Sequence, residues 1–376
     1  MGNKSKIGAV VLVAGYSSRM GHFKPLLPFA GATVIESIIH MFRRAGITEI
    51  IVVVGHRADE LIPVLDGLAV RHIMNEKYDE GMFSSIVKGV QALTPEIEGF
   101  FLLPGDMPLV KSHTIRLLCR KFRKTNADVV YPVFQNHRGH PPLIGAKCIA
   151  DIILGKQTAG LRQILAGYEV KCSELEVIDE GILQDLDTQE DYQKVDKAYH
   201  RHIPTPAECD EILSRKNVAN RIRTHGRVVA EVSRKLAIQL NQAGLHIDVN
   251  AVIAAGKLHD IAKGKVNHAK MGARIIRNFG YPKIAEMIAT HTDIVLGDEV
   301  LPDEATVLYL ADKLVKGDCI VTLEERLSSA MEKYRDDIEA AAMIRKRHLC
   351  AQKIATAVEQ LLAVSLVKVL EEPCYL

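Results

Sequence analysis

The sequence predicts two domains of different class, an α/β domain with a mostly parallel sheet followed by an all-α domain. Three observations support this. Up to about residue 190, short apolar runs typical of buried strands alternate with amphipathic helical stripes. After about Tyr199 helical periodicity continues and no convincing strand follows. The length of 376 residues suits two domains of roughly 150 residues each.

The N-terminal region alternates between predicted strands and helices. Residues 7–14 form an apolar run that ends at Gly15, which is typical of a buried parallel strand. Residues 34–45 carry apolar side chains at helical spacing, and Gly46 follows where a helix would stop. We expect strands at residues 7–14, 49–54, 100–103 and 128–134, and helices at 34–45, 84–93 and 112–123. Strands and helices in this order predict a mostly parallel sheet covered by helices.

The C-terminal region is expected to be helical throughout. Thr224 and Asp248 are predicted as N-caps, and Pro282 stands at a first helical position. The expected helices span residues 227–240, 248–261, 269–278, 282–291 and 303–316, and a helical tail runs from 322 to about 370. We expect this tail to pack on its own domain, with a contact in a homodimer as the alternative.

The domain boundaries follow from these changes in pattern. Pro204 and Pro206 mark a stretch typical of a linker or a domain entry. We therefore assign residues 1–198 to the α/β domain and 199–211 to the linker. Residues 212–320 form the all-α domain, and residues 321–376 form a C-terminal helical extension.

Composition excludes several classes of protein. Hydrophobic residues make up 48% and charged residues 25% of the chain, which is ordinary globular composition and excludes disorder. The net charge is only +2, so binding to nucleic acid through bulk charge is not expected. The apolar run near the N-terminus is too short for a membrane span, and no membrane association is expected. Seven scattered cysteines without a Cys-x-x-Cys pair indicate reduced thiols in a cytoplasmic protein.

A loop of small residues follows the first predicted strand. Ala14 and Gly15 begin this loop, and Arg19 and Lys24 add two cations to it. Backbone N–H groups of such a loop can approach phosphate oxygens, and the cations suit a polyphosphate. The loop is neither a Walker A motif nor the dinucleotide fingerprint, because the required residues and glycine spacing are missing. The alternative is a solvated basic turn.

Two acidic positions are candidates for a metal site. Asp106 lies just past the predicted strand 100–103, at the carboxyl edge where ligands bind open α/β sheets. Asp187 belongs to a second acidic cluster, residues 185–191. Two carboxylates that converge on one Mg²⁺ commonly hold a nucleoside triphosphate. The alternative is that the second cluster caps a helix.

Taken together, these motifs resemble the MobA-like nucleotidyltransferases. The segments AGYSSRMGHFKPLLPF, PGDMP, RGHPPL and DLDTQEDY occur in the order seen in that family, over about residues 7–195. The fit is best to the molybdenum-cofactor cytidylyltransferases. The resemblance implies a Rossmann-like domain that transfers a nucleoside monophosphate from an NTP to a phosphorylated acceptor such as molybdopterin, with release of pyrophosphate.

The resemblance also implies roles for the residues of the first loop and for the two acids. Gly15, Arg19 and Lys24 would contact the nucleotide phosphates. Asp106 and Asp187 would hold Mg²⁺. The catalytic residues would then be Arg19, Lys24 and Asp106, because they face the phosphates where bonds form and break.

Further positions would contact the nucleoside and the acceptor. Gly81 and Ser85 match the segment that lines the base and ribose, and residues 138–141 would lie on the acceptor side. Ala14 stands where guanylyl relatives carry glycine, which favours CTP as the nucleotide. The cytidylyl branch usually reads Ala-Ala-Gly at this point, and here Val13 replaces the first alanine.

The helical region holds six candidate metal ligands near predicted helix ends. Imidazoles and carboxylates are the ligands that a borderline divalent metal takes. The candidates are His225, His259, Asp260, His268, His291 and Asp312. The chain has 15 histidines, so any single candidate is more readily explained as a surface or core residue. Contributions from several helices together favour a metal site.

This set resembles the HD superfamily of metal-dependent phosphohydrolases. His225, His259, Asp260 and Asp312 match its His…His-Asp…Asp signature. The segments HAKMGA, ATHTDI and LYLADK are similar to its binuclear branch, in which His268 and His291 would ligate a second metal and Asp260 would bridge the two ions.

That resemblance implies hydrolysis of a phosphoester or phosphoanhydride by a metal-activated water. The ligands are mostly imidazole, so Fe, Mn, Zn, Co or Ni is expected rather than Mg²⁺ alone. Lys263 could add positive charge against the phosphate, with a solvated position at the helix end as the alternative.

We therefore expect a bifunctional enzyme, a cytidylyltransferase fused to a phosphohydrolase. Its partners would be an NTP, with CTP favoured, and a small phosphorylated acceptor. Two alternatives stay open. The HD region could be a regulatory module that senses a nucleotide, or the transferase could act on a sugar phosphate or an alditol phosphate.

Overall fold

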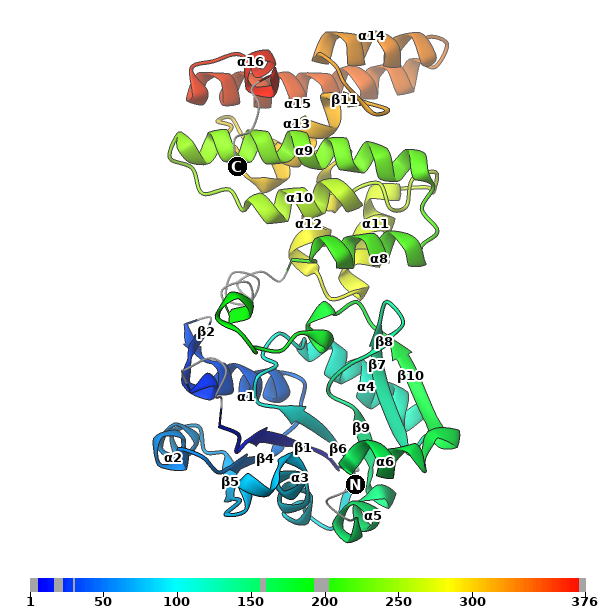
Figure 1. Ribbon diagram of the computed structural model, residues 1–376. Helices are drawn as coiled ribbons and strands as arrows, with labels where there is room; N and C mark the ends of the chain where they lie inside the picture. The colour runs from blue at the N-terminus through cyan, green and yellow to red at the C-terminus, as the bar shows by residue number, and fades with distance from the viewer. Residues whose placement is uncertain (1–5, 17–22, 30, 156–159, 193–202, 372–376) are drawn as a thin grey trace. The chain divides into compact units, whose positions relative to one another are not determined.

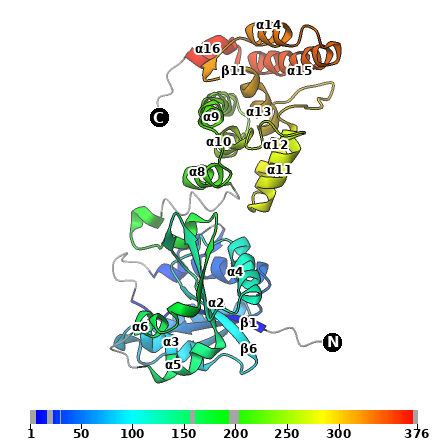
Figure 2. The ribbon, with the colours of Figure 1, turned by 90° about the vertical axis from the view of Figure 1, so that its right-hand side faces the viewer.

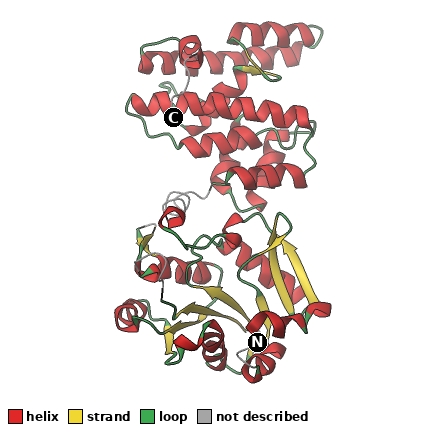
Figure 3. Ribbon diagram, in the orientation of Figure 1, coloured by secondary structure: helices red, strands yellow, loops and turns green. Residues whose placement is uncertain are grey.

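The computed structural model describes residues 6–16, 23–29, 31–155, 160–192 and 203–371. The chain divides into two compact units, Met1–His200 and Arg201–Leu376 (Figure 1). The first unit combines a sheet with helices, and the second is almost entirely helical (Figure 3). The predicted fold class, an α/β domain followed by an all-α domain, is confirmed.

The sheet of the first unit is mostly parallel. Its path runs β10-β7-β9-β6-β1-β4-β5, and β8 pairs with β7 outside this path. The strands are β1 (Lys6–Val13), β4 (Glu49–Val54), β5 (Arg71–Met74), β6 (Ile97–Pro104), β7 (Val129–Phe134), β8 (His137–Arg138), β9 (Leu143–Gly145) and β10 (Cys172–Glu176). Strand β1 is parallel to both β4 and β6, whereas β9 runs antiparallel between β6 and β7.

Helices cover both faces of this sheet. They are α1 (Val34–Arg44), α2 (Ala58–Gly67), α3 (Met82–Gln91), α4 (Ser112–Lys124), α5 (Ile149–Leu154) and α6 (Gly160–Ala166). A short ribbon of β2 (Pro28–Phe29) and β3 (Ala32–Thr33) precedes α1. Helix α1 begins with a capping box in which Thr33 and Glu36 exchange hydrogen bonds, so its start is encoded locally.

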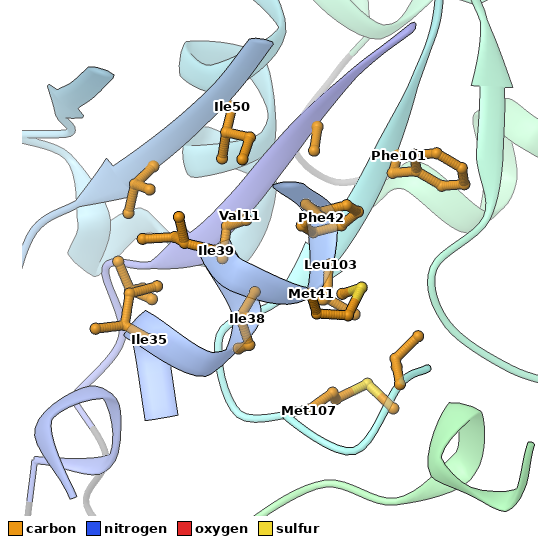
Figure 4. Close-up of a cluster of buried hydrophobic side chains, with 14 of the residues drawn as sticks. Val11, Ile35, Ile38, Ile39, Met41, Phe42, Ile50, Phe101, Leu103 and Met107 are labelled. Carbon is orange, nitrogen blue, oxygen red and sulfur yellow. The ribbon is translucent and has the colours of Figure 1, made fainter. Parts of the chain in front are cut away.

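Neighbouring residues of β1 enter opposite layers of the core. Val11 packs with Ile38, Phe42 and Phe101 beneath α1 (Figure 4). Val10 packs in a second cluster together with residues of β4, α3 and α5. All of these side chains are fully buried or nearly so, and each contributes about 1.5–3 kcal/mol. This packing on both faces fixes β1 at the centre of the sheet.

Four predicted strands and three predicted helices of this unit are confirmed within a few residues. Strands β5, β9 and β10 and helix α2 were not predicted. Strands β5 and β10 are partly exposed and carry charged residues, so they lack the apolar run of a buried strand. Strand β9 is only three residues long. In α2, Pro63 interrupts the helical pattern.

The second unit is a helical assembly around α9 and α10, which pack along one another (Figure 2). Its helices are α8 (Pro206–Arg215), α9 (Asn220–Gln242), α10 (Val249–Leu258), α11 (His268–Asn278), α12 (Pro282–Thr290), α13 (Glu304–Lys313), α14 (Leu323–Lys333), α15 (Ile338–Leu362) and α16 (Leu366–Glu371). Between α13 and α14, β11 (Val315–Lys316) and β12 (Cys319–Ile320) form a small antiparallel hairpin, which was not predicted.

Some expectations for this unit need correction. Thr224 is not an N-cap, because α9 already begins at Asn220. The expected linker 199–211 is helical from Pro206 onward, because Thr205 and Glu208 form a capping box that starts α8. Asp248 is an N-cap and Pro282 is a first helical residue, as predicted.

The helical tail packs on its own unit. Tyr309 on α13 donates a hydrogen bond to the Arg347 carbonyl of α15 at 2.9 Å. The Arg347 guanidinium forms a two-point ion pair with Asp293 at 2.7 and 2.9 Å. These contacts bear out packing within the unit. None of the described helices combines the length and apolarity that a membrane crossing requires.

We expect replacement of Gly89 to destabilise the first unit. A Cβ at this position of α3 would lie 2.4 Å from Val10 Cγ1 and 2.8 Å from Val53 Cγ2. Overpacking of this kind costs about 1–3 kcal/mol, more than the helix gains from losing a glycine. Gly89→Ala should therefore lower the free energy of unfolding by about 1–2 kcal/mol, measured by pulse proteolysis of the full chain in urea.

Gly67→Ala is the matched control, because Gly67 is exposed in α2 and a Cβ there would meet no atom within 4 Å. This control should leave the stability unchanged or raise it by up to about 1 kcal/mol. Equal stabilisation by both substitutions would contradict the close packing of α3 on β1 and β4.

Candidate active sites

A cavity of about 420 Å³ opens at the carboxyl ends of β1 and β6. Parallel pairing brings the ends of these strands to one edge of the sheet, where ligands bind in open α/β folds. The cavity is lined by Leu12, Val13, Ala14, Gly15, Tyr16, Lys24, Pro25, Tyr78, Asp79, Gly81, Met82, Ser85, Pro104, Gly105 and Asp106. The edge predicted to bind a ligand therefore carries the cavity.

A close approach of two backbones places Asp106 at this edge. The N–H of Gly105 donates to the Leu12 carbonyl at 2.8 Å. A Cβ on Gly105 would lie 2.2 Å from Val13 Cγ1, so a larger residue would push β6 away from β1. Gly15 behaves differently, since a Cβ there would meet no atom of the described residues within 4 Å. Among the described residues, Gly15 thus leaves open space in the cavity that Asp106 also lines.

Lys24 joins the two predicted metal-binding acids. Its ammonium Nζ lies 3.2 Å from Asp106 Oδ2 and 2.8 Å from Asp187 Oδ1. Burial disfavours the charged amine, but the hydrogen bond with Asp187 and the charge of Asp106 outweigh this and raise the pKa of Lys24. The ammonium stays charged at neutral pH, and the two carboxylates converge on one cation.

A third acid, Asp185, lies in the same electrostatic environment. Burial and the negative charges of Asp187 and Asp106 raise the pKa of Asp185. The mutual repulsion of these carboxylates favours a cation among them. Sequence reasoning assigned no role to Asp185, although it belongs to the acidic cluster 185–191.

The structure brings most predicted transferase residues together. Ala14, Gly15, Lys24, Gly81, Ser85 and Asp106 all line the cavity. Asp187 joins them through Lys24. Arg19 lies outside the described residues. Arg138, expected on the acceptor side, pairs with Glu169 at 2.5 Å and Glu174 at 2.6 Å, so its guanidinium is already held by two carboxylates.

An aromatic cluster at the cavity was not found from the sequence. The ring of Tyr16 lies 5.0 Å from that of His56 and 5.4 Å from that of Tyr78. Tyr16 is 53% exposed and lines the cavity together with Tyr78. Such a surface suits stacking of a flat ring. Tyr78 follows β5, and because that strand was not predicted, its end could not be placed beside the loop after β1.

The second site gathers the six predicted ligands from five helices or their ends. His225 comes from α9, His259 and Asp260 follow α10, His268 begins α11, His291 follows α12 and Asp312 lies on α13. Four of them are almost fully buried: His259, Asp260, His291 and Asp312. A buried cluster of this kind needs a compensating partner for its polar atoms.

Asp260 lies at the centre of the cluster. Its Oδ2 faces His259 Nε2 at 3.5 Å and His225 Nε2 at 3.9 Å. Its Oδ1 faces His268 Nε2 at 3.4 Å and His291 Nε2 at 3.6 Å. The ligand atoms therefore form two groups of three that share Asp260, each with all atoms within 4.8 Å of one another.

Asp312 completes the first group. Its Oδ1 lies 3.2 Å from His225 Nε2 and 3.5 Å from His259 Nε2. Its Oδ2 accepts a hydrogen bond from the Lys313 ammonium at 2.7 Å. Lys263 contacts the other aspartate, with its Nζ 2.8 Å from Asp260 Oδ2. Both aspartates are thus paired with a lysine as well as with imidazoles.

Backbone carbonyls orient three of the imidazoles. Nδ1 of His225, His259 and His291 lies 2.8, 2.8 and 2.7 Å from the carbonyls of residues 317, 256 and 288. A carbonyl can only accept, so each Nδ1 carries a hydrogen and each Nε2 faces the cluster, where it offers a lone pair once the ring is neutral. This is the tautomer that a metal ligand requires.

Polar atoms at the centre lack the partners that burial demands. Among the described residues, none makes a hydrogen bond to His259 Nε2 or Asp260 Oδ1, although both atoms are buried. Burial lowers the pKa of His259, but Asp260 and Asp312 outweigh it and raise this pKa to about 10. The pKa of Asp312 is well below its usual value. The cluster is therefore built around positive charge, and divalent ions fit it.

Comparison with known families agrees with this division of the chain. Residues 9–173 match the family described as MobA-like NTP transferase domain, and residues 222–317 match the HD domain family. The chain therefore contains a nucleotidyltransferase domain of the MobA-like class followed by an HD domain, and both point to an enzyme.

Individual relatives cover the transferase domain. The molybdenum cofactor cytidylyltransferase of Escherichia coli K12 is 29% identical over 199 residues, which are 52% of this chain and 98% of that protein. The bifunctional protein GlmU of Syntrophomonas wolfei is 29% identical over 139 residues, but the match spans only 30% of it. A nucleotidyl transferase structure from Methanothermobacter shows 28% identity and a TM-score of 0.46, covering 52% of this chain and 98% of that one.

The shared position of Asp260 leads to a prediction about metal content. His259→Ala removes a fully buried ligand next to Asp260, so we expect it to abolish most bound metal. His291→Ala removes a ligand of the other group, and about one ion should remain. Metal analysis of the full-length protein after anaerobic loading with Fe²⁺ or Mn²⁺ measures both.

His246→Ala is the matched control, because His246 is exposed in the same unit and belongs to neither group. It should retain the metal content of the unchanged protein. A normal metal content in His259→Ala would contradict the assignment of the cluster as a metal centre.

Proposed function

We propose that the first domain transfers a nucleotidyl group from an NTP, preferably CTP, to a phosphorylated acceptor such as molybdopterin. The observation that carries this proposal is the convergence of Lys24, Asp106 and Asp187 at one cavity with Gly15, Gly81 and Ser85. The similarity to the cytidylyltransferase of Escherichia coli supports the choice of nucleotide and acceptor.

The residues of the cavity suit attack of one phosphate on another. The acceptor phosphate is already an oxyanion at neutral pH, so no general base is needed to activate it. An oxygen of the acceptor phosphate attacks the α-phosphorus of the NTP. The bond between the α-phosphorus and the oxygen that bridges it to the β-phosphorus breaks, and pyrophosphate leaves. Lys24, which stays charged, would stabilise the negative charge of the leaving pyrophosphate. Arg19 of the same loop would add a second positive charge.

Asp106 and Asp187 are the residues that would hold Mg²⁺. Their oxygens are ligands that Mg²⁺ prefers, and both already contact the same cation, the ammonium of Lys24. Bound there, Mg²⁺ would neutralise charge that develops on the phosphates. The preference for CTP rests on Ala14, which stands where guanylyl relatives carry glycine.

We propose in addition that the HD domain hydrolyses a phosphoester or phosphoanhydride with two divalent transition metals. His225, His259, Asp260 and Asp312 would hold the first ion, and His268, His291 and Asp260 the second. Such a pair of ions supplies an activated water and a clamp for the phosphate. Lys263, next to Asp260, would direct its charge toward the same phosphate.

The transferase assignment predicts a large effect at Asp106. Asp106→Ala should reduce pyrophosphate release from CTP, with molybdopterin as acceptor, by roughly a thousandfold, because one of two metal carboxylates is lost. Asp59→Ala, an exposed acid on α2, is the control and should leave the rate unchanged. A panel of GTP, ATP and UTP, and of sugar and alditol phosphates as acceptors, identifies the substrates.

Near-normal pyrophosphate release by Asp106→Ala would contradict its role. Better turnover with a sugar phosphate or with GTP would overturn the choice of acceptor or base but keep the reaction class.

The two activities should be separable in the full-length protein. His259→Ala should lose hydrolysis of a panel of phosphoesters and nucleotides while it keeps pyrophosphate release. Asp106→Ala should show the reverse pattern. Release of phosphate measures hydrolysis. If the metal-loaded, unchanged protein hydrolyses none of these compounds, a regulatory role of the HD domain replaces the catalytic one.

A further inference from the structure

Asn75 is a buried residue that belongs to none of the motifs found in the sequence. Its side chain forms a hydrogen bond with Ser85, which lines the nucleotide cavity. Asn75 follows β5 and is completely buried. Its N–H donates to the Val54 carbonyl at 2.8 Å, which ties it to the end of β4. Its side chain reaches the first turn of α3, where Ser84 and Ser85 lie 2.8 and 2.9 Å from its Nδ2.

The orientation of the Asn75 amide is determined by its neighbours. The N–H of Lys77 lies 3.1 Å from Oδ1 and can only donate, so the atom that faces it is the oxygen. Ser84 Oγ is 2.8 Å from both the Gly81 and the Lys77 carbonyls, and its hydrogen is used on one of them. The Asn75 NH₂ group therefore donates one hydrogen to each serine.

This polarity leaves Ser85 with a hydrogen to donate. Its oxygen accepts from Asn75, so its O–H must point elsewhere. Among the described residues no group accepts a hydrogen bond from Ser85 Oγ, although the residue is only 4% exposed and lines the cavity. A buried donor without an acceptor is costly. A ligand in the cavity can supply that acceptor.

We propose that Asn75 is a positioning residue that fixes Ser85 as a hydrogen-bond donor to an oxygen acceptor on the bound nucleoside. The proposal rests on nucleotide binding in this cavity, as proposed above. The acceptor is either a ring carbonyl oxygen, such as O2 of cytosine, or the 2′-hydroxyl oxygen of the ribose. A ligand with an amino group at this position would direct its N–H toward the Ser85 O–H. Two donors that face each other form no hydrogen bond, so such a ligand would be rejected.

Asn75→Asp tests the polarity directly. The carboxylate still accepts from the Lys77 N–H, but it cannot donate to the serines, and the Ser85 O–H turns toward it. We expect the KM for CTP to rise roughly tenfold with kcat nearly unchanged. Ser85→Ala should cause the same change. In the double variant the two effects should not add, because both remove the same hydrogen bond.

Ser84→Ala is the matched control, since Ser84 uses its hydrogen on a backbone carbonyl and does not line the cavity. It should leave the KM unchanged. If Asn75 only supports the fold, Asn75→Asp will lower the melting temperature and raise the KM equally with Ser85 present or absent, and that additivity would overturn the proposal.

Nucleotide analogues distinguish the two acceptors and need no variant of Asn75. With the unchanged protein, 2-thio-CTP should bind roughly tenfold more weakly than CTP if the acceptor is the ring carbonyl, and 2′-deoxy-CTP should do so if it is the ribose. Ser85→Ala should remove that difference. Equal binding of all three nucleotides would contradict the proposed donor.

Calorimetric binding of the same nucleotides separates this proposal from the proposed reaction. If the unchanged protein binds CTP but releases no pyrophosphate with any acceptor, the reaction is wrong, while the Asn75 and Ser85 variants still test the hydrogen bond. Normal turnover together with unaltered CTP binding in Asn75→Asp would overturn only the role of Asn75.

Discussion

The parallel pairing of β1 with β4 on one side and β6 on the other is the constraint on which the first domain depends. Parallel strands end at the same edge, so three loops distant in sequence meet there. The close approach at Gly105 sets Asp106 against the end of β1, and Lys24 then ties this acid to Asp187. A short set of backbone contacts thereby assembles a charged site from segments more than 160 residues apart.

The HD domain differs from the first domain because the carboxylates of its cluster lie in the interior rather than at an open edge of a sheet. Five helices and their ends bring imidazoles and carboxylates to one point, and backbone carbonyls orient three of the four rings. The buried Asp260 and Asp312 would be strongly destabilising without positive charge nearby. Lys263 and Lys313 provide part of it, and the two carboxylates also raise the pKa of His259, which favours its positively charged form.

Periodicity and motif spacing predicted the elements and site residues whose signals are local. The buried strands β1, β4 and β6 read as apolar runs, and the acids and histidines of both sites stand in recognisable spacings. Exposed edge strands carry no such signal, so β5 was missed, and with it the positions of Asn75 and Tyr78. The direction of the Asn75 amide depends on three hydrogen-bond partners in space, which no one-dimensional pattern contains.

Capping boxes start α1, α8, α13 and α14, each from residues within a single turn. For α8 this has a practical consequence near the boundary between the two units. Thr205 and Glu208 hold the first turn of α8 by their own hydrogen bonds, at 3.0 and 3.2 Å. A chain that begins just before Thr205 retains both bonds. The helix therefore carries its own start, and this property allows a helical domain to be joined to a preceding segment without redesign of its first helix.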